Sequence, residues 1–162
     1  MDNKPTQSAL WNYINRTQIT KEQTADLTNF KSSPVNFKIA LWNPQANGIR
    51  YLKALTYFLC TSLTSENWER IHRIKNRHVG NPFTVRYNGE EICLDYLQAV
   101  HELDFIARNV PLDGMRVMEI GAGYGRTCHA IMSNHEVDIY SIVDLPNCLD
   151  LSRKYLERVL DE

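Results

Sequence analysis

The sequence predicts an α/β protein in which a mainly helical region precedes the start of a parallel sheet. After residue 116 the pattern runs strand (117–120), helix (126 to about 134), strand (139–143) and helix (about 148 to 160). The second strand of this series, at 139–143, is apolar almost throughout, which is typical of parallel strands that are covered on both faces. A glycine-rich turn joins the first strand to its helix. These observations favour a βαβα arrangement with a right-handed crossover.

Helical patterns occupy most of the chain between residues 8 and 63. Thr20 and Gln23 have the spacing of a capping box, and apolar residues recur at helical intervals from Ile49 to Leu59. Proline removes a backbone donor and restricts the residue before it, so we predict loops at Pro34 and at 43–48. This part of the chain is expected to form a small helical cap.

A short helix and a β-hairpin are expected next. The helix spans 66–75, with Trp68, Ile71 and Ile74 on its inner face. Alternating apolar residues then lead to the dipeptide Asn88-Gly89, a strong signal for a two-residue hairpin turn. We therefore place a hairpin at about 83–94.

A longer helix should follow the hairpin. Asp95 and Gln98 have capping-box spacing, and Tyr96, Val100, Leu103 and Ala107 continue the apolar pattern until Pro111 and Gly114. After this helix the sequence changes from mainly helical patterns to alternating strand and helix patterns. We divide the chain into a cap at 1–110 and the first part of an α/β domain at 111–162. Since two parallel strands alone make a poorly stable sheet, we expect this chain to be a fragment of a longer enzyme.

Composition excludes several classes of protein. The net charge of −1 offers no basic surface for nucleic acid or an anionic membrane. No apolar run approaches the roughly 20 residues that span a bilayer, and the polar opening has no signal-peptide core. We expect a cytoplasmic protein. The four cysteines and five histidines follow no metal-ligand spacing, so buried reduced thiols and no metal site are predicted.

The stretch EIGAGYGRT at 119–127 carries the functional interpretation. Glycines at 121, 123 and 125 allow positive φ angles and close approach of a ligand to the backbone. Glu119 ends the strand before this loop, where a carboxylate would repel a pyrophosphate and favour a cationic group. Asp144 ends the next strand, at the same edge of the sheet, and could accept hydrogen bonds from two ribose hydroxyls.

We predict a cofactor site made by the loop and by the end of the second strand. Structural alternatives remain open: a tight turn for the glycines, a helix cap for Asp144, a solvated strand end for Glu119, and a surface position for Arg126, which could equally bind a ligand carboxylate. The predicted cofactor-binding residues are Glu119, Gly121, Ala122, Gly123, Tyr124, Gly125, Arg126, Thr127, Asp144 and Leu145. Tyr96 or Arg86 could cover the cofactor, but we expect Tyr96 and His129 in the core and Arg86 in a solvated strand position.

The loop distinguishes between cofactors. A GxGxxG dinucleotide fingerprint needs a small residue at position 126, where this chain has Arg. The pattern ExGxGxG, with an acid one strand later, resembles the S-adenosylmethionine site of class I methyltransferases. The resemblance implies a Rossmann-like sheet, with Glu119 near the cationic end of S-adenosylmethionine.

The two motifs together, at 119–127 and 142–146, resemble a family of sugar O-methyltransferases. The sequences WNP at 42–44, NG at 47–48, YLK at 51–53, GNP at 80–82 and DYL at 95–97 extend the similarity over most of the chain. The resemblance implies a sugar hydroxyl as acceptor. Relatives that methylate amino groups of aminoglycoside sugars leave the acceptor atom open. In such folds the base often comes from loops after later strands, so we assign no catalytic residue.

Two functional classes other than a methyltransferase remain open. One is an NAD-dependent oxidoreductase built on the same kind of sheet, which Glu119 and Arg126 argue against. The other is a catalytically silent binding module. Trp11, Trp42 and Tyr57 could form a homodimer surface, although aromatic residues at helical spacing are more often core.

Overall fold

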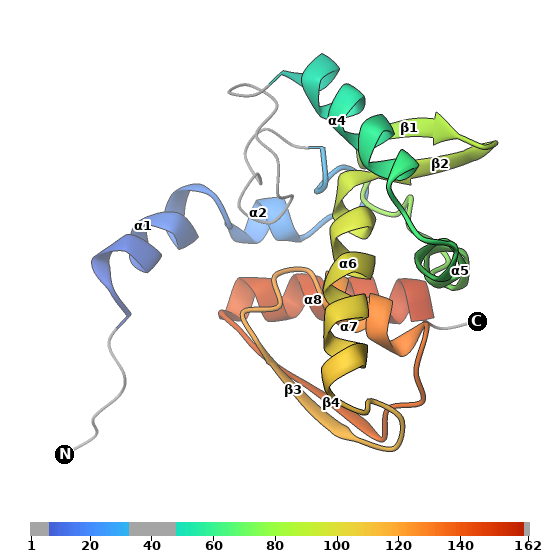
Figure 1. Ribbon diagram of the computed structural model, residues 1–162. Coiled ribbons are helices and arrows are strands. Elements are labelled where there is room, and N and C mark those ends of the chain that lie inside the picture. Colours follow the sequence, from blue (N-terminus) through green and yellow to red (C-terminus); the bar gives the residue numbers. More distant parts are fainter. Residues whose placement is uncertain (1–6, 33–47, 161–162) are drawn as a thin grey trace.

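A computed structural model describes residues 7–32 and 48–160 of the chain (Figure 1). This part contains seven helices and two sheets of two strands each. The expectation of a mixed α/β protein is therefore confirmed, while a larger Rossmann-like sheet and the domain boundary at residue 110 stay predictions. The loop predicted at Pro34, most of the loop predicted at 43–48, and Trp42 lie outside the described residues.

The helices and strands follow the predicted order with small changes in their bounds. The helix predicted from Cys148 begins at Pro146, and the helix expected to reach Asn134 ends at Met132. The elements are α1 (Ala9–Thr17), α2 (Lys21–Thr24), α4 (Ile49–Thr61), α5 (Ser65–Arg73), β1 (Thr84–Tyr87), β2 (Glu90–Cys93), α6 (Leu94–Asn109), β3 (Arg116–Ile120), α7 (Arg126–Met132), β4 (Ile139–Val143) and α8 (Pro146–Leu160).

Local capping explains several of the helix starts. The Thr20–Gln23 capping box is confirmed, because the Thr20 hydroxyl accepts from the Gln23 backbone and the Gln23 side chain accepts from the Thr20 backbone. Ser8 and Thr64 cap α1 and α5 in the same way, with hydroxyl oxygens that accept from backbone amides.

The hairpin turn is the one that the sequence predicts. Asn88 and Gly89 have φ angles of 50° and 88°, and β1 pairs antiparallel with β2 with Tyr87 opposite Glu90. The second predicted capping box is wrong. The N-cap of α6 is Cys93, no side chain caps that helix, and Asp95 lies inside its first turn, where its carboxylate accepts from Tyr124 instead.

The strands β3 and β4 form the predicted parallel pair, with Glu119 opposite Ile142 and Ile120 opposite Val143. Figure 1 shows this pair and the hairpin at opposite ends of α6. One face of the pair is covered, since Val117 and Tyr140 pack on a small core that includes Leu103 of α6 and Ile131 of α7.

The other face of the β3–β4 pair is open. Met118 and Ile120 are 67% and 80% exposed, and Ile139 and Val143 on β4 are about half exposed. The expectation that both faces are covered is therefore wrong for the part of the chain that the structure describes.

Two further cores hold the rest of the described chain together. One joins α4, α5, the hairpin and α6 around Ile71, Ile74 and Leu97, which confirms the inner face predicted for α5. The other joins the segment from Ile14 to Phe30 to α8. The exposed aromatic rings of Trp11 and Tyr57 contradict the interpretation that they belong to the core.

None of the described helices combines the length and the apolar character needed to cross a membrane.

Candidate functional site

The glycine loop has the backbone geometry that its sequence predicts. Gly121, Gly123 and Gly125 have φ angles of 80°, 60° and 91°, a region that side chains with a Cβ rarely adopt. A Cβ added at Gly121 or Gly123 would meet no atom within 4 Å, whereas one at Gly125 would lie 3.0 Å from the Leu156 side chain. The first two glycines therefore border open space, and the third permits close packing on α8.

Asp144 is bound directly to this loop. Its carboxylate accepts from the backbone amides of Gly123 and Leu145, each at 2.7 Å. The backbone amide of Gly121 donates to Val143 at 2.8 Å, so the loop stays beside the end of β4. The Cys148 thiol also faces Asp144, and burial together with this carboxylate raises the pKa of Cys148 to about 12. The structure thus brings Gly121, Gly123, Asp144 and Leu145 together at one edge of the sheet.

Glu119 lies on the covered side of the sheet, one residue before β3 ends. Its carboxylate accepts from the Tyr140 hydroxyl at 2.9 Å and from the Thr127 hydroxyl. Burial raises the pKa of Glu119 above its usual value, against the lowering effect of these hydrogen bonds and of Arg126. Glu119 is therefore a partly desolvated carboxylate beneath the loop and not a solvated strand end.

Arg126 already has a carboxylate partner inside the protein. Its Nη2 donates to both carboxylate oxygens of Glu102 of α6, at 2.9 and 2.8 Å, and its Nη1 reaches the backbone oxygen of Asp95. This pair ties the start of α7 to α6. The sequence left two interpretations of Arg126 open, a free surface arginine and a clamp on a ligand carboxylate. In the structure Arg126 instead binds Glu102 through Nη2.

Tyr124 points away from the open side of the loop and into the interior. Its ring is buried, and its hydroxyl donates to Asp95 at 2.8 Å. Burial, first, and then the Asp95 charge raise the pKa of Tyr124 well above its usual value. The side chain of Tyr124 therefore anchors the loop in the interior, and only the backbone of Tyr124 could contact a ligand.

The structure places an unpredicted cation in contact with this anchor. We call this group the Lys31 cluster; it consists of Phe30, Lys31, Tyr96, Tyr124, His129 and Tyr155. The Lys31 side chain is buried, and its Nζ lies 4.6, 4.8 and 5.1 Å from the ring centroids of Tyr155, Tyr124 and Tyr96. The ammonium donates to the Tyr155 hydroxyl at 3.0 Å, and is stabilised by the ring faces around it.

A chain of hydrogen bonds runs from Lys31 through the cluster to His129. The hydroxyls of Tyr155 and Tyr96 are bonded to each other, and the Tyr96 hydroxyl lies 2.6 Å from His129 Nδ1. With Lys31 donating at one end, the chain ends on Nδ1 as acceptor, which places the ring proton on Nε2. Nε2 has no hydrogen-bond partner among the described residues.

Burial controls protonation in the Lys31 cluster. Burial lowers the pKa of Lys31 to about 8, although Cys93 and Asp95 oppose this shift. Burial, and then the charges of Lys31 and Arg77, lower the pKa of His129 to about 3, so the imidazole is neutral at pH 7. The expectation that Tyr96 and His129 pack in the core is confirmed, and Arg86 is exposed as expected.

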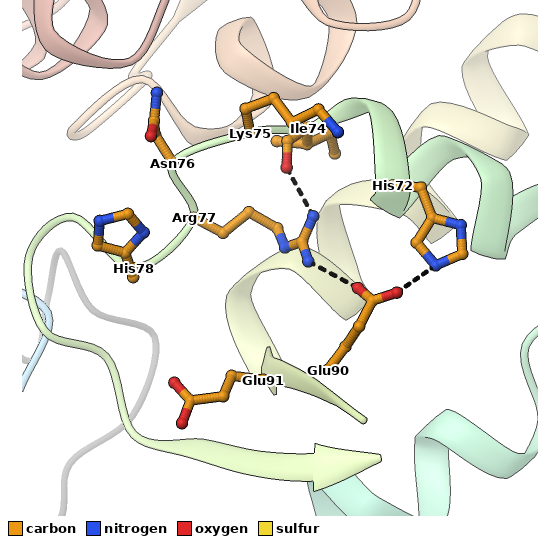
Figure 2. Close-up of a pocket in the computed structure, with 8 residues that line it drawn as sticks. All are labelled: His72, Ile74, Lys75, Asn76, Arg77, His78, Glu90 and Glu91. Carbon is orange, nitrogen blue, oxygen red and sulfur yellow. Dashed lines mark hydrogen bonds and ion pairs between the residues drawn. The ribbon is translucent and has the colours of Figure 1, made fainter. Parts of the chain in front are cut away.

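A cavity of about 600 Å³ lies elsewhere, between the segment after α5 and the strand β2. Figure 2 shows Glu90 between His72 and Arg77: its carboxylate lies 2.6 Å from the His72 ring and 3.1 Å from the Arg77 guanidinium. Arg77 also donates to the backbone oxygen of Ile74 at 2.6 Å. His78 and Glu91 line the opposite side of the same hollow in Figure 2. No residue of this cavity belongs to the predicted cofactor site.

The four cysteines are free and buried, which confirms their interpretation as reduced core thiols. Within residues 7–32 and 48–160, no group of three or more His, Cys, Asp or Glu side chains is placed to hold a metal ion. Comparisons with models of known protein families, with curated protein sequences and with solved structures gave no match.

Proposed function

We propose that this chain is the cofactor-binding part of an S-adenosylmethionine-dependent methyltransferase that acts on a sugar hydroxyl. The observation that carries the proposal is the shared position of Glu119 and Asp144. Glu119 lies near the carboxyl end of β3, and Asp144 directly follows β4 and accepts a hydrogen bond from Gly123 of the glycine loop. Ligands of open α/β sheets bind at this edge.

The residues at this edge fit the cofactor. Open space beside Gly121 and Gly123 lets a ligand approach the backbone. The Asp144 carboxylate would accept hydrogen bonds from the two ribose hydroxyls, and Glu119 supplies negative charge near the loop for a sulfonium or an ammonium group. The cofactor, when bound, supplies an electrophilic methyl group. The protein residues bind and orient it, and no base is assigned.

We propose a sugar as the acceptor because the sequence resembles that of sugar O-methyltransferases. An amino sugar is the alternative acceptor, because a neutral amine needs less help from a base than a hydroxyl does. The proposal includes the cytoplasm as location. It concerns a small-molecule substrate, without nucleic acid or membrane as partner.

Calorimetric titration with S-adenosylhomocysteine and, separately, with NAD tests the proposal. We expect saturable binding of S-adenosylhomocysteine and no binding of NAD, because Glu119 would face the pyrophosphate. Binding of NAD alone would favour an oxidoreductase, and binding of neither would contradict a nucleoside cofactor.

Transfer of a labelled methyl group to a panel of neutral sugars and aminoglycosides then tests the acceptor. Labelling of neutral sugars supports O-methylation, and labelling restricted to amino sugars supports the N-methyl alternative. Cofactor binding without transfer to any acceptor would favour a silent binding module.

A further inference from the structure

The segment at residues 29–31, in which Phe30 and Lys31 are buried, touches the glycine loop through the Tyr124 ring. The Phe30 and Tyr124 rings pack edge to face, with centroids 5.1 Å apart, and the Lys31 ammonium lies over the Tyr124 ring. Since Tyr124 stands between Gly123 and Gly125, the packing of its ring fixes the middle of the loop. The adjoining amide of Gly123 is the one that binds Asp144.

The same segment is held in place by the chain around Gly80. The backbone amide of Lys31 donates to the Gly80 oxygen at 2.9 Å, and Asn81 donates to Asn29 at 2.8 Å. Gly80 has a φ angle of 92°, and a Cβ there would lie 2.5 Å from the Phe30 ring and 2.9 Å from Lys31. The fit leaves no room for a side chain at position 80.

We propose that residues 29–31 form a strap that positions the glycine loop for its cofactor, with Phe30 and Lys31 as the positioning residues. The inference rests on the proposed function for its cofactor, but the strap and the loop are defined without it. Docking of the strap holds Tyr124 against Tyr155 and Asp95, and thereby holds Gly123 at Asp144.

The charge of Lys31 makes docking of the strap sensitive to pH. When the strap is docked, burial lowers the pKa of Lys31 to about 8, from an ordinary value of 10.5 in water. Docking therefore releases a proton between these two values, and the docking constant should rise about tenfold from pH 7 to pH 9. The charged and titratable groups around Lys31 are Arg77, Cys93, Asp95, Tyr96, Tyr124, His129 and Tyr155.

Lys31 accounts for the expected change between pH 7 and pH 9. Burial raises the pKa of the tyrosines in this group, and raises that of Cys93 to about 11, so these groups keep their protons. His129, with its lowered pKa, stays neutral over the same range.

The test uses Gly80→Ala, which should push Phe30 and Lys31 out of place, and Gly89→Ala as control. Gly89 also has a positive φ angle but borders open space in the hairpin turn. At pH 7 we expect Gly80→Ala to weaken binding of S-adenosylhomocysteine at least about tenfold, and Gly89→Ala to leave it unchanged. At pH 9 the affinity of Gly80→Ala, relative to wild type at the same pH, should recover about tenfold.

The double variant Gly80→Ala/Lys31→Met separates positioning from simple destabilisation. Met has no charge to titrate, so the loss of affinity in the double variant should be the same at pH 7 and at pH 9. A folded Gly80→Ala protein with wild-type affinity, or with a loss that is the same at pH 7 and pH 9, would overturn the strap. Should Gly80→Ala fail to fold, Asn29→Ala weakens the same docking more gently and is expected to behave alike.

Failure of the proposed function is distinguishable from failure of the strap. If wild type does not bind S-adenosylhomocysteine, the proposed function fails, and hydrogen exchange of the amides at 121–125 then tests the strap alone. Faster exchange there in Gly80→Ala, but not in Gly89→Ala, supports the strap. Unchanged exchange in both variants overturns it.

Discussion

The glycine loop and the cavity of Figure 2 both gather charged side chains, but they differ in burial. At the loop, burial shifts the pKa of Glu119 upward and that of the nearby Lys31 downward. In the cavity, the side chains of His72 and Glu90 are 51% and 38% exposed, and water screens the charge of Glu90. Shifted proton equilibria are typical of functional sites, so the loop is the stronger candidate, although the cavity of about 600 Å³ lies elsewhere.

The largest expected effect is a loss of cofactor affinity when the glycine loop is altered, compared with a substitution in the cavity. Asp144→Ala should weaken binding of S-adenosylhomocysteine by about a hundredfold or more, since two charge-assisted hydrogen bonds of about 1.5–3 kcal/mol each are lost. Calorimetry measures this, with Asp138→Ala, an exposed residue near β4, as control. A larger loss from Glu90→Ala than from Asp144→Ala would move the site to the cavity.

Acid should destabilise the protein through His129. Its pKa is about 3 in the folded protein and about 6.5 when unfolded, so between these values only the unfolded chain binds the proton. Stability therefore falls as pH drops below 6.5, by about 3 kcal/mol at pH 4. Urea unfolding should show a smaller fall for His129→Gln, and an unchanged fall for the exposed His101→Gln. Equal acid sensitivity of wild type and His129→Gln would contradict the neutral, buried imidazole.

Two glycines with similar backbone conformations sharpen the comparison further. Gly123→Ala and Gly89→Ala each place a Cβ at a positive φ angle in open space, so both should lose about 1 kcal/mol of stability. Only Gly123→Ala should also weaken the binding of S-adenosylhomocysteine, because its Cβ would occupy the ligand side of the loop. Thermal unfolding and calorimetry on the same samples check both points. Equal affinities of the two variants would remove Gly123 from the site.

The smallest effect is expected in the cavity. Glu90→Gln breaks its pairs with His72 and Arg77, but these groups are partly exposed and Arg77 keeps its backbone acceptors. The free energy of unfolding should change by less than about 1 kcal/mol. A loss of 3 kcal/mol or more in urea unfolding would show that this cluster behaves as a buried network.

Local patterns predict much of this fold because local contacts produce it. The Thr20–Gln23 capping box, the Asn88-Gly89 turn and the glycines of the loop each act within a few residues. The parallel pairing of β3 and β4 also follows from sequence, because a short helix between two apolar strands leaves few other arrangements.

Contacts between distant segments explain what the sequence does not reveal. Lys31 and Tyr155 are 124 residues apart, and nothing in the local pattern around Lys31 indicates that its ammonium is buried. Asp95 has the spacing of a helix cap, but a tertiary hydrogen bond from Tyr124 takes its carboxylate. The sequence gives one local signal for this cluster, which is Tyr124. It places a large aromatic ring between two glycines, in a turn that requires no aromatic side chain.

Chemical-shift mapping with S-adenosylhomocysteine tests the central claim most directly, because it reports on both regions at once. We predict shifts of the backbone amide signals of Gly121, Gly123 and Leu145, with the side-chain signals of His72 and His78 unmoved. Shifts confined to the cavity, or no shifts at saturating ligand, would contradict a cofactor site at the glycine loop.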